Sequence, residues 1–216
     1  MRKIFDVDSP LAKAMNMLAN VIVLSVLWLV GCIPVVTAGA STSAAYYAAR
    51  QSGEPGESLW KRYWRAFRRD WRQAVCVELL CLIPAASLLG GAYILTAVGD
   101  SVPVLLSGAY GVLLYLAAAF LSCVFPLLSY FDYPTGTLLK NALLIAFANP
   151  GWTFLTVLTG LLPLLLAMLP PVWLVRILPL VTALVPGAVI RINSAVYARV
   201  FRKYVRPEEE TARTQT

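Results

Sequence analysis

The sequence predicts an all-α, polytopic membrane protein with about five transmembrane helices and one cytoplasmic amphipathic helix in the membrane interface. Of its 216 residues, 59% are hydrophobic and 13% are charged, whereas soluble domains carry about 25% charged residues. The mean hydropathy of +0.72 comes from long uncharged runs. We expect residues 1–206 to form one helical membrane domain and residues 207–216 to form a disordered polar tail.

The first helix is expected to begin at Pro10, with Ser9 as its N-cap residue. Proline suits the first helical position because the backbone N–H that it lacks has no partner there. The run from Ala14 to Ala49 contains no charged residue. Its first half, about residues 18–36, is long enough to cross the hydrocarbon core and is the first predicted span.

Pro34 and Gly39 interrupt this run, and small or hydroxylated residues follow as far as Ala49. Small residues let membrane helices approach closely, so a packing surface is the favoured interpretation. The alternative is a re-entrant or kinked element that lines a polar cavity, where backbone groups freed by the break are satisfied. The candidate polar site then consists of Pro34, Thr37, Ser41, Thr42 and Ser43.

Residues 58–73 form a helix with one aromatic and one basic face when wound at about 100° per residue. Such a helix lies in the headgroup layer, with its rings at the acyl boundary and its cations against anionic lipid. Alternating cations and aromatic residues also bind single-stranded nucleic acid, but the apolar runs on both sides favour the membrane and predict no nucleic-acid partner. The predicted interface residues are Trp60, Lys61, Arg62, Tyr63, Trp64, Arg65, Phe67, Arg68, Arg69, Trp71 and Arg72.

The remaining predicted spans follow in order and are separated by short polar or proline-rich segments. A short apolar segment, 141–147, precedes the break at Asn149–Pro150. The tail after residue 206 is polar. The predicted spans cover about residues 74–98, 104–131, 152–169 and 172–200.

The distribution of cations predicts the topology, because cytoplasmic segments are enriched in Lys and Arg. Residues 50–72 carry seven of them and are assigned to the cytoplasm, together with the connection 132–140 and the C-terminal tail. Five crossings then place the N-terminus outside, where its three cations, Arg2, Lys3 and Lys13, oppose the rule. The alternative is a re-entrant helix pair over residues 20–49, with the N-terminus inside.

Two ionisable residues lie inside predicted spans, where charge is costly. Glu78 is about 9 Å past Arg72 and Arg191 is about 12 Å before Arg199, at a rise of about 1.5 Å per residue. Their matched depth and opposite charge predict an ion pair between Glu78 and Arg191. Arg176, near the outer end of the last span, is expected to extend to the headgroups.

The sequence has no feature that indicates catalysis. It contains no histidine, which excludes His-dependent triads and most zinc hydrolase sites. Its four cysteines lie in apolar runs without metal-binding spacing, so free thiols are expected. Phosphate-binding loops and nucleophile motifs are missing as well. We therefore expect no enzyme activity, no cofactor and no metal.

Three segments carry a family resemblance. Residues 28–47 read WLVGCIPVVTAGASTSAAYY, residues 125–150 read FPLLSYFDYPTGTLLKNALLIAFANP, and residues 5–10 follow the pattern F-x-x-D-S-P. These segments resemble the YesL-like family of bacterial integral membrane proteins. Together with the aromatic-basic stretch, the similarity covers nearly the whole chain. Ser25 departs from the family's pattern, in which a second amide is expected in the first span. The family is typical of Gram-positive bacteria, often accompanies carbohydrate uptake genes, and has no established activity.

The resemblance implies a multi-pass protein of the bacterial plasma membrane that assists or regulates carbohydrate uptake without being an enzyme. Its expected partners are anionic lipid headgroups and a sugar permease, and the oligomeric state is left open. One alternative is a small secondary transporter with a polar site at the bilayer midplane. A membrane-embedded lipid-handling enzyme is a further alternative, disfavoured because histidine and metal motifs are missing.

Overall fold

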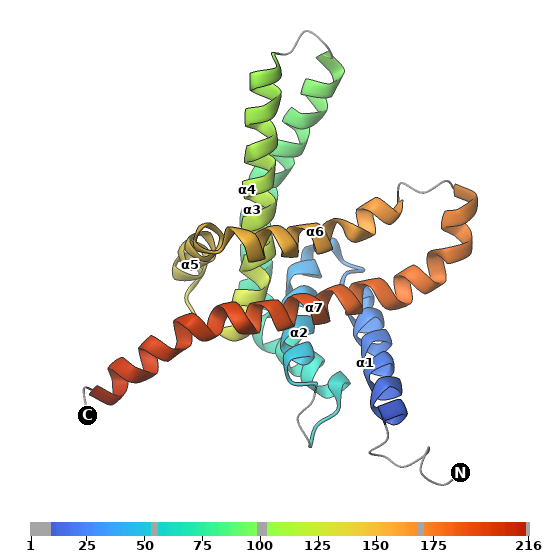
Figure 1. Ribbon diagram of the computed structural model, residues 1–216, viewed down its shortest axis with the longest axis vertical. Helices are drawn as coiled ribbons and strands as arrows, with labels where there is room; N and C mark the ends of the chain where they lie inside the picture. The colour runs from blue at the N-terminus through green and yellow to red at the C-terminus, as the bar shows by residue number, and fades with distance from the viewer. Residues whose placement is uncertain (1–9, 53–55, 99–102, 168–170, 215–216) are drawn as a thin grey trace.

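The computed structural model describes the backbone of residues 10–52, 56–98, 103–167 and 171–214, and side chains within 14–52, 56–97 except Thr96, 103–162 and 178–202. All regular structure in these ranges is helical, which confirms the predicted all-α fold (Figure 1). Ser9, the three N-terminal cations and the Arg176 side chain lie outside the described part. The helices are α1 (Pro10–Gly31), the 3₁₀ turn η2 (Val35–Thr37), α2 (Ala38–Arg50), α3 (Leu59–Val98), α4 (Val104–Tyr130), α5 (Thr135–Ala148), α6 (Pro150–Ala167) and α7 (Pro171–Thr214).

Among the residues that the structure describes, four helices are long and apolar enough to cross a membrane, in agreement with the expectation of about five spans. A fifth candidate is the pair α5 and α6, which bend by 104° at Asn149. Pro150 explains this break, because proline disfavours helical geometry in the residue before it and is itself favoured as the first residue of a new helix. The four long segments are Ala14–Gly31, Leu59–Leu95, Val104–Tyr130 and Leu178–Arg202.

The chain reverses direction between α1 and α2. Trp28 of α1 donates its indole N–H to Thr42 Oγ1 at 3.0 Å, and its backbone carbonyl accepts a hydrogen bond from Ser41 Oγ at 2.8 Å. With 13 residues, α2 is about 20 Å long and too short to cross the hydrocarbon core. The first candidate span ends at Gly31 rather than near residue 36, and α2 folds back against α1 instead of continuing in its direction.

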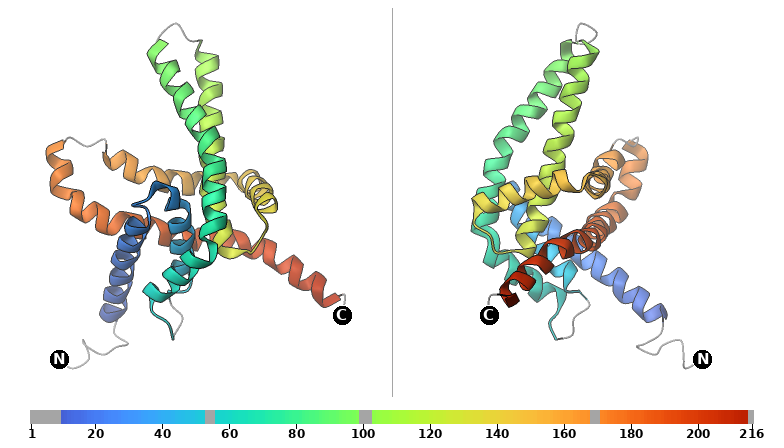
Figure 2. Two further views of the ribbon diagram at one scale, coloured as in Figure 1. Left: turned by 180° about the vertical axis from the view of Figure 1, so that it is seen from behind. Right: turned by 60° about the vertical axis from the view of Figure 1, so that its left-hand side comes forward.

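We predicted that the amphipathic stretch would be a separate interfacial helix. It is instead the first part of α3. This helix runs 40 residues from Leu59 to Val98 without interruption (Figure 2). No Gly or Pro occurs in it before Pro84, so the local sequence contains nothing that ends the helix near residue 73. At about 1.5 Å per residue α3 measures about 60 Å, twice the hydrocarbon thickness of about 30 Å. Its basic first part therefore extends well beyond any segment that the membrane core can cover.

The small-residue helix α2 occupies the centre of the molecule and packs against α1, α3, α4 and α7. The favoured interpretation of this segment as a packing surface is confirmed. Alanine and serine on α2 allow backbones to approach closely, and a Cβ at Gly39 would collide with the Phe125 ring. The α2 residues buried there are Gly39, Ala40, Ser41, Ser43, Ala44, Ala45, Tyr46, Ala48 and Ala49.

Helices α6 and α7 run beside each other and cross the α3–α4 hairpin (Figures 1 and 2). Helix α7 continues through Thr214, whereas we predicted a disordered tail over residues 207–216. Extending an existing helix avoids the cost of nucleation, and the tail contains Glu, Ala and Arg, which favour helices.

Candidate functional site

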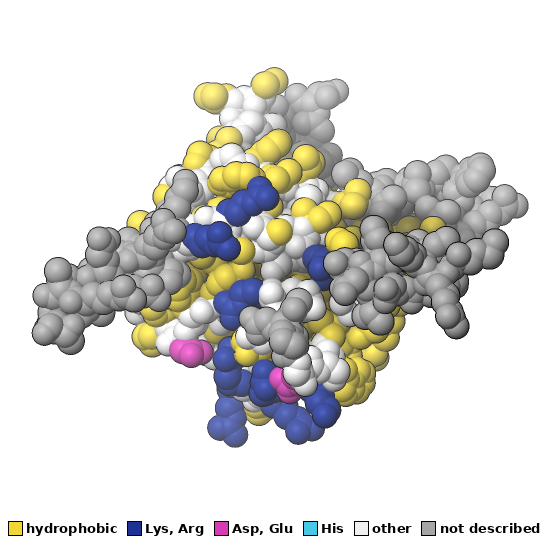
Figure 3. Space-filling view, turned by 60° about the horizontal axis from the view of Figure 1, so that its bottom comes forward, with side chains coloured by type: hydrophobic (Ala, Val, Ile, Leu, Met, Phe, Trp, Pro, Cys, Tyr) yellow, Lys and Arg dark blue, Asp and Glu magenta, His cyan; other side chains and the backbone are white. Residues whose placement is uncertain are grey.

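The exposed cations of α3 form one continuous surface at its N-terminal end. We call Lys61, Arg65, Arg68, Arg69 and Arg72 the basic surface; all five side chains are exposed. Figure 3 shows Lys and Arg side chains gathered at this end of the molecule. A surface of this kind attracts anionic groups, whether on lipid headgroups or on a protein partner.

An open groove of about 610 Å³ lies along the basic surface. The indole rings of Trp60 and Trp64 meet edge to face, with centroids 5.7 Å apart. Arg65 Nη1 lies 2.7 Å from Glu57 Oε2, which holds the guanidinium at the groove. The residues that line the groove are Glu57, Trp60, Lys61, Trp64, Arg65 and Arg68.

The aromatic face of α3 does not face lipid as a whole, contrary to the prediction. Tyr63 is fully buried, Trp64 and Phe67 are half-buried, and only Trp60 and Trp71 are exposed. Helix α2 covers this face, because its small side chains leave room for large rings. The Tyr63 hydroxyl donates to Ser41 Oγ at 2.8 Å, since the Ser41 proton is already given to the Trp28 carbonyl.

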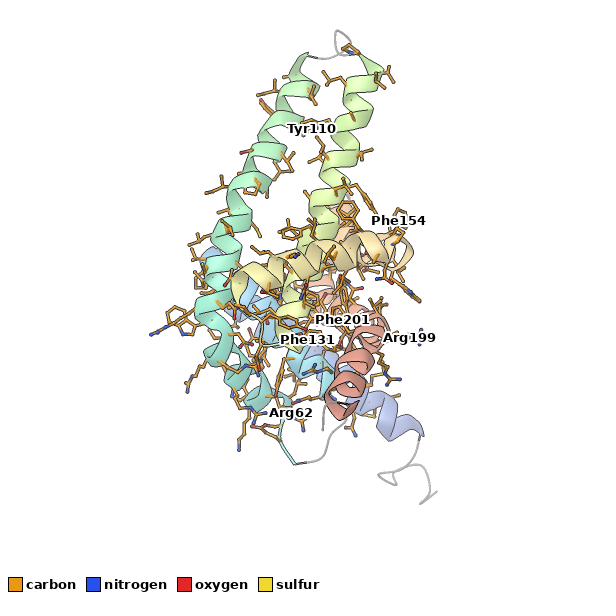
Figure 4. The ribbon with its side chains drawn as sticks, turned by 90° about the vertical axis from the view of Figure 1, so that its left-hand side faces the viewer. Arg62, Tyr110, Phe131, Phe154, Arg199 and Phe201 are labelled. Carbon is orange, nitrogen blue, oxygen red and sulfur yellow. The ribbon has the colours of Figure 1, made fainter. Side chains whose placement is uncertain are left out.

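Arg62 also departs from the predicted membrane-interface set. Its side chain is only 4% exposed, and Figure 4 shows it at the lower end of α3, close to the start of the helix. It occupies the buried side of α3 next to Tyr63, so it does not belong to the basic surface.

Arg69 of the basic surface and Arg50 of α2 contact aromatic rings, and Arg69 also forms an ion pair with Asp70. Arg69 donates through Nε and Nη2 to the Asp70 carboxylate at 2.7 and 2.9 Å. The Arg69 guanidinium also lies 5.2 Å from the Tyr47 ring centroid, and that of Arg50 lies 4.2 Å from Tyr130. Sequence reasoning missed this network. The available signal was Asp70, because it is the one acidic residue in the cation-rich stretch of residues 58–73.

The predicted ion pair between Glu78 and Arg191 is not formed. Glu78 Oε2 accepts a hydrogen bond from the Gly39 backbone N–H at 2.8 Å, and Arg191 Nη1 donates to Ser52 Oγ at 2.8 Å. Helical rise sets the depth of a residue in the membrane but leaves open which neighbour its side chain faces. The carboxylate of Glu78 lies at the N-terminus of α2, where the helix dipole favours negative charge.

The five residues of the candidate polar site do not converge on one cavity. Thr37 Oγ1 donates to the carbonyls of Gly31 and Pro34, so its hydroxyl satisfies backbone acceptors at the break between α1 and α2. Thr42 Oγ1 donates to the Ala38 carbonyl. Ser43 is fully buried and its hydroxyl has no hydrogen-bond partner, while Pro34 is exposed. Hydroxyls that bond to nearby backbone groups in this way have a structural role.

Thr42 does line a different cavity of about 430 Å³ between α1, α2, α4, α6 and α7. Its polar groups come from five helices that are spread along the sequence, which is why sequence reasoning missed it. Its apolar wall is mostly the segment of α7 between Leu178 and Ile190. The polar lining residues are Trp28, Thr42, Tyr46, Ser122, Thr156, Thr182 and Asn193.

Aromatic residues at the end of α4 and on α7 contact one another. Phe131 and Phe201 lie next to each other in Figure 4, with ring centroids 5.8 Å apart. The Tyr197 hydroxyl donates to the Ser122 carbonyl at 2.6 Å and lies 3.2 Å from Thr156 Oγ1. Tyr197 therefore joins α7 to α4 and α6, and it holds the inner end of the cavity together.

All four cysteines lie in the part of the chain that the structure describes. Cys32, Cys76, Cys81 and Cys123 are all free thiols, as predicted. Within the same residues, no group of three or more His, Cys, Asp or Glu side chains is placed to hold a metal ion.

Part of the chain matches the model of a known protein family. Residues 21–89 match a family described as protein of unknown function, DUF624. This match agrees with the resemblance to the YesL-like family. Comparisons with curated proteins and with solved structures return no match. Together with the apolar helices, the match makes the chain a multi-pass membrane protein.

The DUF624 segment covers the second half of α1, all of α2 and most of α3. It therefore contains the basic surface, the groove and the contact between Glu78 and Gly39. Helix α7, which forms most of the cavity wall, lies outside the matched residues.

Proposed function

We propose that this chain is a non-enzymatic accessory protein of the bacterial plasma membrane that docks a partner on its basic surface. The observation that carries the proposal is the length of α3, because its 40 residues place the basic first part beyond the hydrocarbon core. There the cations and the exposed Trp60 are available to a partner. Arginine and tryptophan are enriched at binding hot spots, and fixed positive charge attracts an acidic partner surface.

The proposed partner is a membrane-integral subunit of a carbohydrate permease. This choice rests on the family context, since YesL-like proteins often accompany carbohydrate uptake genes. The groove contributes the chemistry: its cations suit acidic side chains, and its indole rings suit apolar ones. Anionic headgroups compete for the same surface, so docking is proposed to take place at the membrane interface.

We further propose that the basic surface is cytoplasmic, in accordance with the positive-inside rule. The reversal between α1 and α2 then puts the start of α1 on the same side as Arg50. This arrangement removes the conflict that five crossings created for Arg2, Lys3 and Lys13. We therefore favour an N-terminus on the cytoplasmic side, in place of the outside location predicted from the sequence.

Photo-crosslinking in the native membrane tests the proposed docking. A photoreactive amino acid at Lys61 is expected to form an adduct with a carbohydrate permease subunit, identified by mass spectrometry. The same amino acid at Val112, which is exposed on α4, provides the control. Arg65→Glu with Arg68→Glu should abolish the Lys61 adduct. Adducts with lipid alone, or equal capture from both positions, would refute the proposal.

A small transporter remains a second candidate because of the 430 Å³ cavity among the helices. Transporter sites lie where helices of different repeats meet. Uptake of a radiolabelled sugar by the purified protein in proteoliposomes separates the two functions, since an accessory protein alone should transport none.

A further inference from the structure

The cavity between α1, α2, α4, α6 and α7 changes in character from its mouth to its inner end. At the mouth, Leu178 is 46% exposed and Leu29 is 36% exposed. At the inner end, Asn193 is 3% exposed and Thr156 is 2% exposed. The mouth residues belong to apolar segments long enough to span the membrane, so the mouth opens toward hydrocarbon and the polar groups lie deepest.

The polar inner end has hydrogen-bonding capacity left over. Thr159 Oγ1 donates to Asn193 Oδ1 at 2.8 Å, which fixes the orientation of the amide. The Asn193 amide nitrogen carries two donor hydrogens, and the Tyr46 hydroxyl lies beside it. The Ser122 hydroxyl makes no hydrogen bond to any other residue that the structure describes. The half-buried Ser122 hydroxyl and the remaining Asn193 amide hydrogen are thus able to donate to a ligand, so these groups favour a ligand that brings acceptors.

The size and charge of the cavity limit what it can hold. Its volume of about 430 Å³ falls in the range of about 300–1,000 Å³ that small-molecule sites occupy. No Lys, Arg, Asp or Glu is among the described residues that line it, so a charged headgroup would have no counter-ion. A hydrocarbon chain would replace the packing contacts that an empty apolar cavity lacks.

We infer that this cavity binds a neutral membrane lipid, one with a hydrocarbon chain and an uncharged acceptor such as an ester. The ester lies at the inner end, against Asn193, Tyr46 and Ser122, and the chain extends past Val185 toward the mouth. The surrounding bilayer supplies the ligand directly, because the mouth opens into it. This site is separate from the basic surface and does not depend on the proposed docking function.

Gly160 on α6 provides a sharp test, because it lines the cavity and a Cβ added there meets no atom within 4 Å. The Cβ of Gly160→Leu therefore displaces no neighbour, and the larger side chain takes up space that the cavity now offers a ligand. Gly151→Leu is the matched control, since Gly151 lies on the same helix, also has open space around it, and is not part of the lining. Both changes replace glycine by leucine, so they share the same gain in helix propensity.

The probe is a diacylglycerol with a diazirine in one acyl chain, added to the full chain in phosphatidylcholine nanodiscs. Labelling is expected on α7 peptides that include Val185, and Gly160→Leu should lower it about tenfold, equivalent to about 1.4 kcal/mol of binding. Gly151→Leu should leave it unchanged. A diazirine-bearing alkane without ester groups should label these peptides less strongly than the diacylglycerol does. Ser122→Ala should reduce the difference between the two probes, because it removes a donor to the ester.

Equal labelling of all lipid-facing helices, unaffected by Gly160→Leu, would overturn the inference, as would equal labelling by the two probes. Size-exclusion chromatography and thermal unfolding establish that each variant is folded. If Gly160→Leu does not fold, Val185→Phe is the alternative variant. It narrows the cavity from α7, so it must also lower the labelling by the diacylglycerol probe.

Discussion

Glu78 of α3 accepts a hydrogen bond from the Gly39 backbone N–H, with 2.8 Å between Oε2 and N, and so caps the N-terminus of α2 from a neighbouring helix. The N-cap position, Thr37, makes no side-chain capping bond of its own. The first N–H groups of a helix lack intrahelical partners, and in a membrane protein water cannot satisfy them. This one contact therefore fastens the central helix to the longest apolar hairpin.

Removing the carboxylate of Glu78 should destabilise the protein. Glu78→Ala is expected to lower the free energy of unfolding by about 1–3 kcal/mol, because the Gly39 N–H is left without an acceptor. Glu78→Gln, which retains an acceptor oxygen, should cost less. Thermal unfolding in detergent measures both. The double variant with Arg191→Gln should show additive losses, since the two residues have different partners; a large coupling energy would contradict the structure.

The crossing of α1 and α7 depends on Gly187. Its backbone N–H donates to Ser25 Oγ at 2.8 Å, and a Cβ at this position would collide with the Val21 carbonyl oxygen. Gly187→Ala should therefore lower the free energy of unfolding by about 1–3 kcal/mol. Gly108→Ala on α4, where space is open, should instead raise it by about 0.5–1 kcal/mol. Equal melting temperatures for the two variants would rule out close packing at Gly187.

The Tyr197 hydroxyl should contribute measurably to the packing of three helices. Tyr197→Phe removes the bond to the Ser122 carbonyl and the contact with Thr156, at an expected cost of about 1–2 kcal/mol. Tyr115→Phe is the control, because no hydrogen bond of the described structure involves the Tyr115 hydroxyl. Chemical unfolding in mixed micelles compares the two. A larger loss for Tyr115→Phe would count against this role.

The reversal between α1 and α2 predicts which residues share a side of the membrane. In a cysteine-free background, single cysteines at Ala14 and Gln51 should react with an impermeant maleimide only after permeabilisation. A cysteine at Val104, at the far end of the α3–α4 hairpin, should react in intact cells. Labelling of Ala14 from outside together with protection of Gln51 would restore the single-crossing topology.

The basic surface should make the protein sensitive to lipid charge. In nanodiscs, phosphatidylglycerol should raise the melting temperature above that in phosphatidylcholine, because each cation near an anionic surface contributes about 1 kcal/mol. Lys61→Glu with Arg65→Glu and Arg68→Glu should remove this gain. Ser107→Glu, which adds an acid on α4 far along the chain from this surface, should preserve it. A gain that survives the triple change would show that other cations are responsible.

Several helix boundaries were predictable because they follow local rules. Pro10 occupies the first position of a helix, as the sequence indicated, and the predicted break at Asn149–Pro150 separates α5 from α6, although α6 begins at Pro150 and not at residue 152. The continuity of α3 was predictable too, since nothing between Leu59 and Pro84 ends a helix, but the change from basic to apolar composition was interpreted as a boundary. The partner of Glu78 was not predictable, because the rise per residue specifies depth without specifying the direction of the side chain.

The sequence by itself determined that this is a helical membrane protein, how many segments can span, and that its cations cluster at one end of α3. Composition and hydropathy suffice for these properties, because each depends on neighbouring residues along the chain. Only the tertiary structure decided that α2 folds back on α1, that Tyr63 is buried and Trp60 exposed, and that Thr42, Ser122 and Asn193 surround one cavity. These features depend on the rotation and crossing of helices distant in sequence, which side-chain packing sets collectively.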